Sequence, residues 1–206
     1  MIRAIVASLA LALSVALSVV ALGSGPAVAG GGHPPTMLGP GDAHVHGIKG
    51  KALIRMSKYG YVYIAGQQHS RLKVTLHQDG KALRYRDTGT GRLTSMPKSC
   101  HRERVGKGIS AMCRIPQRFR DHMFVQVWPR LGNDHVDGHT LPARFRLWVL
   151  TDAGRDVVYG GAGADFVNGA KGDDRMYGAR GNDWLRGGPG RDVIRGGPGH
   201  DRIATG

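Results

Sequence analysis

The chain of 206 residues is long enough for one or two small domains and too short for a large multidomain enzyme. It carries a formal net charge of +14 and contains 33 glycines but only 6% aromatic residues, so little material is available for a thick hydrophobic core. The presence of only two cysteines, with no C-x-x-C pair, argues against a disulfide-dense scaffold and against a structural zinc site.

Residues 1–29 have the pattern of a signal peptide. The basic start Met1–Arg3 precedes the apolar run Ala4–Leu22, and the small residues Ala27–Ala29 follow it. We therefore expect cleavage before Gly30 and a secreted, extracellular chain. The alternative is an uncleaved membrane anchor, because the apolar run approaches the length that spans a bilayer. No second run of that length follows, so no transmembrane segment is expected in the mature chain.

Residues 30–43 are rich in Gly and Pro and are predicted to form a linker. From residue 44 to residue 150 the pattern indicates strands and no helix. Leu72, Val74 and Leu76 alternate with polar residues, and Asp79-Gly80 then supplies a turn before a return strand, which predicts a β-hairpin. Further strands are expected at Tyr59–Ile64, Met123–Trp128 and Phe145–Leu150.

The positive charge is concentrated in residues 30–150, which contain 20 Lys and Arg against 7 Asp and Glu. Such a basic β region suits an anionic cell-surface polymer, and the alternative is an ordinary solvated basic face. The densest basic segments are His101–Arg104 and Arg114–Arg120. Interleaved aromatic residues of a nucleic-acid motif are absent, so no sequence-specific nucleic acid is expected as a partner.

Cys100 and Cys113 have twelve residues between them. In an exported chain the two are expected to form a disulfide that closes a hairpin-like loop and stabilises the fold by about 3 kcal/mol. The alternative, a reactive thiol pair, is less favoured because no C-x-x-C geometry is available.

From Thr151 onward the sequence divides into six units of nine residues, followed by Thr205-Gly206. Position four is Gly in every unit, position six is Asp and position eight is a large apolar residue. The aspartates are Asp156, Asp165, Asp174, Asp183, Asp192 and Asp201. The apolar residues are Val158, Val167, Met176, Leu185, Ile194 and Ile203. A disordered Gly-rich tail is the alternative, but random Gly enrichment would not hold these residues at a fixed phase.

This pattern resembles the haemolysin-type calcium-binding (RTX) nonapeptide repeat, G-G-x-G-x-D-x-U-x. The resemblance implies an all-β fold in which residues 151–206 form a parallel β-helix or β-roll solenoid and position-eight side chains point inward. If two units form one coil, as in the family, the aspartates stack every eighteen residues in two columns. We further expect irregular coils to begin near Met123, with the β-rich, disulfide-containing region before them acting as a cap on the solenoid.

Stacked carboxylates repel one another unless a cation lies between them, and a hard cation with six to eight oxygen ligands fits such a gap. The resemblance therefore implies Ca²⁺ at up to four sites, in the gaps 156/174, 174/192, 165/183 and 183/201. Turn carbonyls would complete the ligand set, and the candidates are the position-one glycines Gly160, Gly169, Gly178, Gly187 and Gly196. Eight basic residues balance eight Asp in this region, which predicts weak binding, with a dissociation constant of about 10⁻³ M.

No G-x-S-x-G, H-E-x-x-H or P-loop motif is present, and neither catalytic residues nor an enzymatic activity are predicted. The sequence favours a secreted calcium-binding protein whose solenoid folds on binding extracellular Ca²⁺. One alternative is a calcium-dependent adhesion or wall-binding module that acts through its basic β region. The other is a small secreted enzyme with an active site that the sequence does not reveal.

Overall fold

The structure, a computed structural model, describes residues 50–206. The proposed signal peptide, the predicted linker and the residues that follow it up to residue 49 lie outside this range. The described chain is built of strands, with one short 3-10 turn, η2 (Gln117–Phe119), so the all-β prediction is confirmed. None of its helical segments is long and apolar enough to cross a membrane.

The first eight strands are β1 (Lys51–Met56), β2 (Gly60–Ala65), β3 (Arg71–Leu76), β4 (Ala82–Asp87), β5 (Arg92–Ser95), β6 (Cys100–Arg102), β7 (Ile109–Arg114) and β8 (Met123–Arg130). The next eight are β9 (His135–Asp137), β10 (Phe145–Thr151), β11 (Val157–Tyr159), β12 (Phe166–Asn168), β13 (Arg175–Tyr177), β14 (Trp184–Arg186), β15 (Val193–Arg195) and β16 (Arg202–Ala204).

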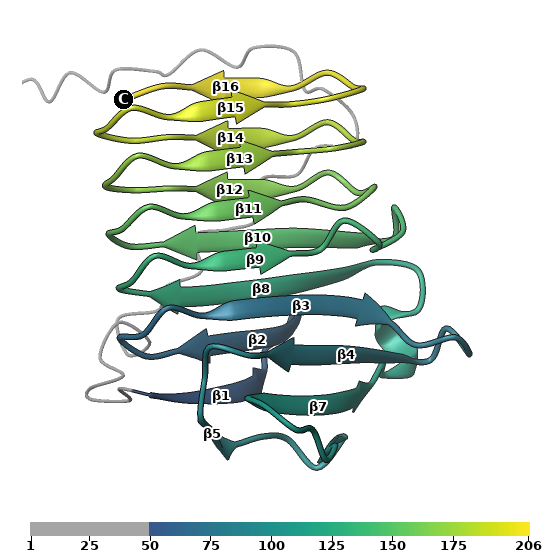
Figure 1. The fold of residues 1–206 in the computed structure, drawn as a ribbon. Coiled ribbons are helices and arrows are strands. Elements are labelled where there is room, and N and C mark those ends of the chain that lie inside the picture. Colours follow the sequence, from purple (N-terminus) through teal and green to yellow (C-terminus); the bar gives the residue numbers. More distant parts are fainter. Residues whose placement is uncertain (1–49) are drawn as a thin grey trace, which may run out of the picture. The chain divides into compact units, whose positions relative to one another are not determined.

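The strands form two eight-stranded sheets that face each other and run the length of the described chain (Figure 1). One sheet has the order β16-β14-β12-β10-β8-β2-β1-β5, and the other has the order β15-β13-β11-β9-β3-β4-β7-β6. From β8 onward each coil contributes one strand to each sheet, and the strands of successive coils pair in parallel. This arrangement is the parallel solenoid that the repeats predict.

The parallel coils extend further toward the amino terminus than Met123, where the sequence suggests that they begin. Strand β2 pairs in parallel with β8, and β3 pairs in parallel with β9, so residues 60–76 already form a coil. Residues 82–114 interrupt the winding, because β4 folds back against β3 and pairs with β7. A sequence search for nonapeptide phase misses this first coil because it contains no Gly-Asp pattern.

The region before the repeats packs antiparallel strands against the first coil. Strands β3 and β4 pair with Leu76 opposite Leu83, which confirms the predicted hairpin around Asp79-Gly80. The disulfide between Cys100 and Cys113 is also confirmed, and it joins directly opposed residues of β6 and β7. We call strands β1 and β4–β7, with the segment that follows them up to residue 122, the cap. In the cap, β1 pairs antiparallel with β2 and β4 with β3, so the edge of the first coil is covered.

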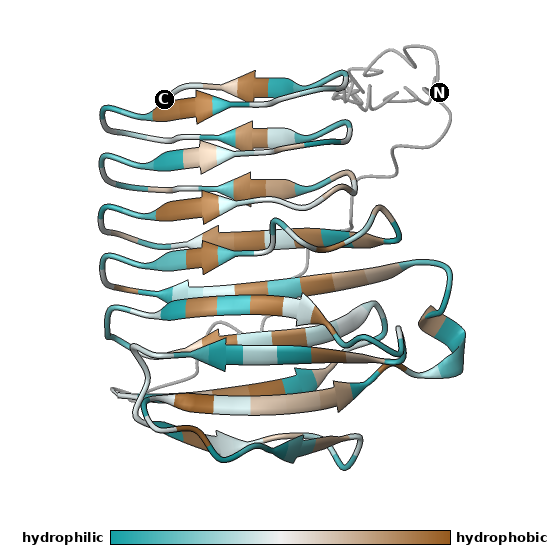
Figure 2. Cartoon of the chain, turned by 45° about the vertical axis from the view of Figure 1, so that its right-hand side comes forward, coloured by the Kyte–Doolittle hydropathy of each residue, from teal (hydrophilic) through white to brown (hydrophobic). Residues whose placement is uncertain are grey.

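The core is a set of apolar columns between the two sheets, visible as the brown centres of the strands in Figure 2. Strand register places Val136 beside Val158, Val158 beside Met176 and Met176 beside Ile194. The predicted inward direction of position eight is therefore confirmed. The last coil is the exception, since Ile203 is 51% exposed whereas Leu185, one coil earlier, is fully buried.

Candidate calcium-binding aspartate columns

The Gly-rich half of each unit makes the tight turn that brings successive coils together. At position four, Gly154, Gly172 and Gly190 have φ between +143° and +153°, and a Cβ at any of them would overlap a carbonyl oxygen of the preceding coil. At position two, Ala170 and Ala179 adopt left-handed φ values of 65° and 74°. These alanines carry backbone strain, because L-residues with a Cβ disfavour that region.

The turns place the six repeat aspartates in two columns, one along each edge of the solenoid, as predicted. In one column the backbone N–H of Asp156 donates to Oδ1 of Asp174 (2.9 Å), and the N–H of Asp174 donates to Oδ1 of Asp192 (3.0 Å). In the other, the N–H of Asp165 donates to Oδ1 of Asp183 (2.8 Å), and the N–H of Asp183 donates to Oδ1 of Asp201 (3.0 Å). Each column is thus a ladder in which one carboxylate oxygen is held by the coil before it.

The second carboxylate oxygen, Oδ2, has no hydrogen-bond partner in most of these residues. Asp156, Asp174, Asp183 and Asp192 each have a buried Oδ2 without a partner, and Asp165 differs because its Oδ2 accepts the N–H of Gly161 (2.7 Å). The aspartates of the first four units, Asp156, Asp165, Asp174 and Asp183, are at most 2% exposed. A buried, unpaired carboxylate oxygen is costly, which is the property expected of a ligand for a cation.

In the five units that begin with Gly, position one has no room for a side chain, because the carboxylate of the same unit lies against the glycine Cα. A Cβ at this position would overlap Oδ2 of the aspartate five residues later, in all five units that begin with Gly. The pairs are Gly160 with Asp165, Gly169 with Asp174, Gly178 with Asp183, Gly187 with Asp192 and Gly196 with Asp201. The structure therefore brings the predicted glycines and aspartates together.

Burial raises the pKa of the aspartates in the columns. Desolvation is the largest cause, and it raises the pKa of Asp174 and of Asp183 to about 6. The pKa of Asp156 is also raised, and that of Asp165 is raised well above its ordinary value. Neighbouring carboxylates in the columns add to the shift at Asp174, through Asp156 and Asp192. Without a cation, the ionised columns are therefore destabilised.

The donor set fits a hard cation. Carboxylate oxygens and turn carbonyls are the ligands that Ca²⁺ takes in proteins. Within residues 50–206 no group of three or more His, Cys, Asp or Glu side chains is placed to hold a metal ion. As the resemblance implies, one or two aspartates would contribute to each site and turn carbonyls would supply the other ligands. A bound Ca²⁺ would supply positive charge between two carboxylates. The position-six aspartates would hold it there.

One aspartate of the same kind lies outside the repeats and was not predicted as a site residue. The backbone N–H of Asp134 donates to Oδ1 of Asp156 (2.8 Å), so Asp134 continues the first column by one coil. Its burial raises its pKa to about 8, the carboxylate of Asp156 adding to the shift. The sequence does contain a signal, since Gly132 and Val136 surround Asp134 with the spacing of the repeats. The second column has no such extension and begins at Asp165. In the coil before it, Leu147 occupies the equivalent place, and the Leu147 N–H donates to Oδ1 of Asp165.

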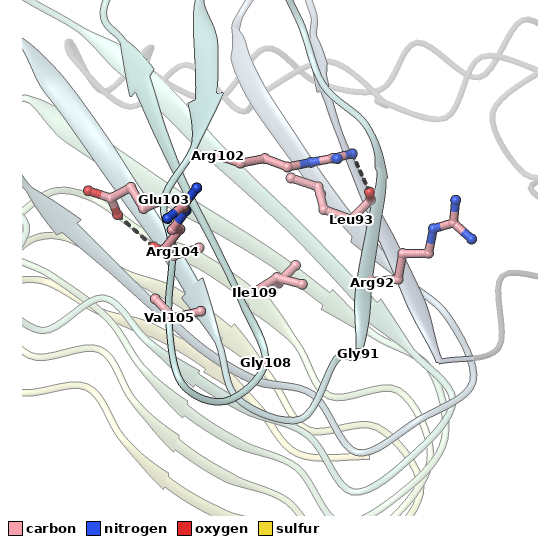
Figure 3. A pocket seen from close by; sticks show the side chains of 10 residues that line it. Gly91, Arg92, Leu93, Arg102, Glu103, Arg104, Val105, Gly108 and Ile109 are labelled. Carbon is pink, nitrogen blue, oxygen red and sulfur yellow. Dashed lines mark hydrogen bonds between the residues drawn. The ribbon is translucent and has the colours of Figure 1, made fainter.

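A separate basic cavity lies in the cap, away from the columns. It has a volume of about 480 Å³, and Arg92, Arg102 and Arg104 lie around it (Figure 3). The Arg102 guanidinium donates to the carbonyl of Leu93 (2.6 Å), whereas the guanidinium groups of Arg92 and Arg104 have no ion-pair or hydrogen-bond partner in residues 50–206. Part of His101–Arg104, one of the two densest basic segments of the sequence, therefore borders a cavity.

The one carboxylate at this cavity is already neutralised. Glu103 accepts two hydrogen bonds from the Arg84 guanidinium, both 2.9 Å, which lower the pKa of its carboxyl. Ser110 donates a further hydrogen bond to the same carboxylate (2.6 Å). The positive charge of Arg92 and Arg104 is thus left uncompensated by Glu103.

Comparison with known protein families identifies the repeats. Residues 148–176 and 177–206 match the family described as RTX calcium-binding nonapeptide repeat (4 copies). The carboxyl-terminal part of the chain is therefore an array of RTX repeats, and RTX nonapeptide repeats bind Ca²⁺. The resemblance drawn from the sequence and the calcium prediction are confirmed, whereas the individual ligand residues remain predictions. No curated protein and no solved structure matches the chain significantly.

Proposed function

We propose that this is a secreted calcium-binding protein whose solenoid folds when it binds extracellular Ca²⁺. The observation that carries the proposal is the row of buried aspartate Oδ2 atoms without partners in Asp156, Asp174, Asp183 and Asp192. Burying a polar oxygen without a hydrogen-bond partner costs about 1–3 kcal/mol, and the cost is larger when the oxygen is charged. The role proposed is binding, and no catalytic step is part of it.

Calcium binding and folding are coupled in this proposal because the ligand set exists only in the wound chain. Asp165 and Asp183 are eighteen residues apart in sequence and come together only when two coils stack. The unwound chain avoids the repulsion between carboxylates and keeps the conformational entropy of its many glycines. Calcium that binds the wound state alone therefore adds its binding free energy to the folding free energy.

A fluorescence titration tests the coupling. Trp184 lies in a repeat and packs edge-to-face against Phe166 at 5.0 Å between ring centroids, so its emission reports the winding of the array. We expect a cooperative change in tryptophan emission as Ca²⁺ rises toward millimolar concentration, and little change with Mg²⁺, which requires a tighter octahedral site. An emission spectrum that is the same with Ca²⁺ and with chelator would contradict the proposal.

Export through an amino-terminal signal peptide is the second part of the proposal. The support is the sequence of residues 1–29, with its basic start, apolar run and Ala27–Ala29. Cytoplasmic calcium is low and extracellular calcium is high, so export would place the columns where their ion is available. Sequencing the protein from culture medium should give Gly30 as the first residue. Full-length chain retained in the membrane would support the anchor alternative instead.

A second candidate function is binding of an anionic cell-surface polymer through the cap. The supporting observation is the cavity bordered by Arg92, Arg102 and Arg104. The guanidinium groups of Arg92 and Arg104 have no partner in residues 50–206. Sulfate, phosphate or carboxylate groups of a polymer are the anions that a guanidinium cluster recognises. The solenoid would then act as a calcium-dependent support for the cap.

Co-sedimentation with an anionic polymer at increasing salt tests this second function. The double variant Arg92→Glu with Arg104→Glu should abolish binding if the cavity is the site. The matched control is Arg180→Glu with Arg191→Glu, which makes the same charge change at exposed positions of the repeats. Equal loss in the two variants would mean that only net charge matters, and the cavity would not be a site.

A further inference from the structure

Residues 129–137 have the conformation of a nonapeptide unit although the family match begins at residue 148. Arg130 has φ +70°, as Ala170 and Ala179 have at position two of the repeats. Gly132 has φ +139°, close to that of Gly172 at position four. At position eight, Val136 is completely buried beneath Val158. The backbone therefore makes an RTX-type turn here, with Pro129 in place of the usual first Gly.

Asp134 occupies position six of this turn, and its carboxylate has the same surroundings as those of the repeats. Its Oδ1 accepts the backbone N–H of Ser70 (2.6 Å), and its own N–H donates to Oδ1 of Asp156 (2.8 Å). Asp134 and Asp156 are 2% and 1% exposed, and Oδ2 of each has no hydrogen-bond partner. The gap 134/156 thus joins two buried carboxylates on neighbouring coils, as the gap 156/174 does.

No basic side chain compensates this pair. The ion pairs found within residues 50–206 do not include Asp134 or Asp156, and Arg130 of the same turn pairs with a different carboxylate, that of Asp152, at 4.0 Å. The hydrogen bonds to Oδ1 satisfy only one oxygen of each group. Two ionised carboxylates buried this way without a counterion would be strongly unfavourable.

We propose that a divalent, oxygen-binding cation of the calcium type binds between the coils of Asp134 and Asp156, outside the recognised repeats. The two carboxylates would supply one or two ligands, and turn carbonyls would supply the others. The inference deepens the proposed function and rests on it, since it extends calcium binding by the columns to an irregular coil with a spacing of 22 residues instead of 18.

This site would join the solenoid to the cap. Ser70, which holds Asp134, donates its hydroxyl to Oδ2 of Asp87 (2.6 Å). Asp87 is fully buried and also accepts a hydrogen bond from the hydroxyl of Tyr63 (2.7 Å). The column therefore continues from Asp156 through Asp134 and Ser70 into a buried polar network between the first coil and Asp87 of the cap. A cation in the gap 134/156 would stabilise the cap and not only the repeats.

The test is the substitution Asp134→Asn in the full chain, because Asn keeps an oxygen for the Ser70 N–H and removes the charge. Calorimetric titration with Ca²⁺ should show one bound ion fewer than wild type, and calcium should raise the midpoint of thermal unfolding by less. Asp121→Asn, at an exposed position of the cap, is the matched control and should leave both quantities unchanged. Unchanged stoichiometry in Asp134→Asn would overturn the inference.

Asp183→Asn separates the failure of this inference from the failure of the proposed function. Loss of calcium by Asp183→Asn but not by Asp134→Asn would overturn only the site at 134/156, and loss by neither would overturn both. If Asp134→Asn does not fold, crystals of the wild-type protein grown with Ca²⁺ decide the question. Anomalous density between the Asp134 and Asp156 carboxylates supports the site, and its absence while repeat gaps are filled overturns it.

Discussion

The aspartates of a column differ in how many neighbouring coils they contact. Asp183 is linked to both neighbours, since it accepts the N–H of Asp165 and donates its own N–H to Asp201. Asp201 belongs to the last coil and faces only one neighbouring aspartate. It is also less buried than Asp183, which is 1% exposed. The consequence of removing a carboxylate should therefore depend on its place in the column.

Asp183→Ala should impair calcium-induced folding more than Asp201→Ala, because the first change removes a ligand from two gaps and the second from one. We expect the midpoint of a calcium titration followed by circular dichroism to rise at least about tenfold for Asp183→Ala, as loss of a metal-site group usually costs that much. Asp201→Ala should give a smaller rise. Equal midpoints for the two variants would show that the gaps are not shared in this way.

At position two of the repeats, an exchange between Ala and Gly should have opposite effects on stability in neighbouring coils. Ala170 is already left-handed at φ 65°, so Ala170→Gly should relieve strain and stabilise the calcium-bound chain by about 0.5–1 kcal/mol. Gly188, at the same position one coil later, has φ 95°, and a Cβ there would overlap the carbonyl oxygen of Ala170. Gly188→Ala should therefore destabilise. Denaturant unfolding in saturating Ca²⁺ measures both changes, and a loss of stability in Ala170→Gly would contradict this reading.

At the scale of the element, each of the first four strand–turn units of the repeats combines a buried apolar residue with a buried aspartate. The pKa of Asp174 and of Asp183 is about 6 in the folded chain, above the ordinary value of 3.8. Between these two values the folded chain holds more protons than the unfolded chain, so raising the pH removes stability from the metal-free protein. Calcium takes the place of the protons and should reverse this dependence.

We therefore expect the metal-free protein to lose thermal stability as the pH rises from about 4 to about 6, with a further loss toward pH 8 from Asp134. In saturating Ca²⁺ the midpoint should instead fall as the pH drops below about 6, because protons compete for the ligands. Thermal scans across this range, with Ca²⁺ and with chelator, measure the two trends. A chelated protein that becomes more stable with rising pH would contradict the assignment.

The repeat elements could be predicted from the sequence because the residue type at each position of the nine-residue unit fits its place in the coil. Position eight and position six of the six units lie where the nine-residue period places them, with Met176 buried in the core and Asp174 in its column. The hairpin at Asp79-Gly80 and the pairing of Cys100 with Cys113 also follow from local signals. These features depend on contacts that neighbouring or periodically spaced residues make.

The elements that could not be predicted from the sequence depend on contacts between residues far apart in the chain and without a regular spacing. Strands β1, β5, β6 and β7 are short or have mixed polarity, and the parallel pairing of β2 with β8 joins residues more than sixty positions apart. Asp134 escapes as a ligand candidate because its unit begins with Pro129 and its spacing to Asp156 is 22 residues. Only the stacking of coils brings these two residues together, through the hydrogen bond from the Asp134 N–H to Oδ1 of Asp156.

At the scale of the whole molecule, one stack of coils carries two different surfaces. The cap holds the disulfide and the arginine cavity, and the repeats hold the aspartate columns. The cap supplies strand partners for the first coil, and the buried chain from Tyr63 through Asp87 and Ser70 reaches the first column. Calcium bound along the columns would thus also stabilise the cap, which contains most of the chain's net positive charge.

The central claim is that the stacked coils require a cation between their buried carboxylates. Far-ultraviolet circular dichroism of the purified protein in Ca²⁺ and in excess chelator tests it most directly. We predict a β spectrum with a cooperative thermal transition in Ca²⁺, a largely unfolded spectrum for the repeats in chelator, and recovery when Ca²⁺ is restored. An identical spectrum and an identical thermal midpoint in both solutions would contradict the claim.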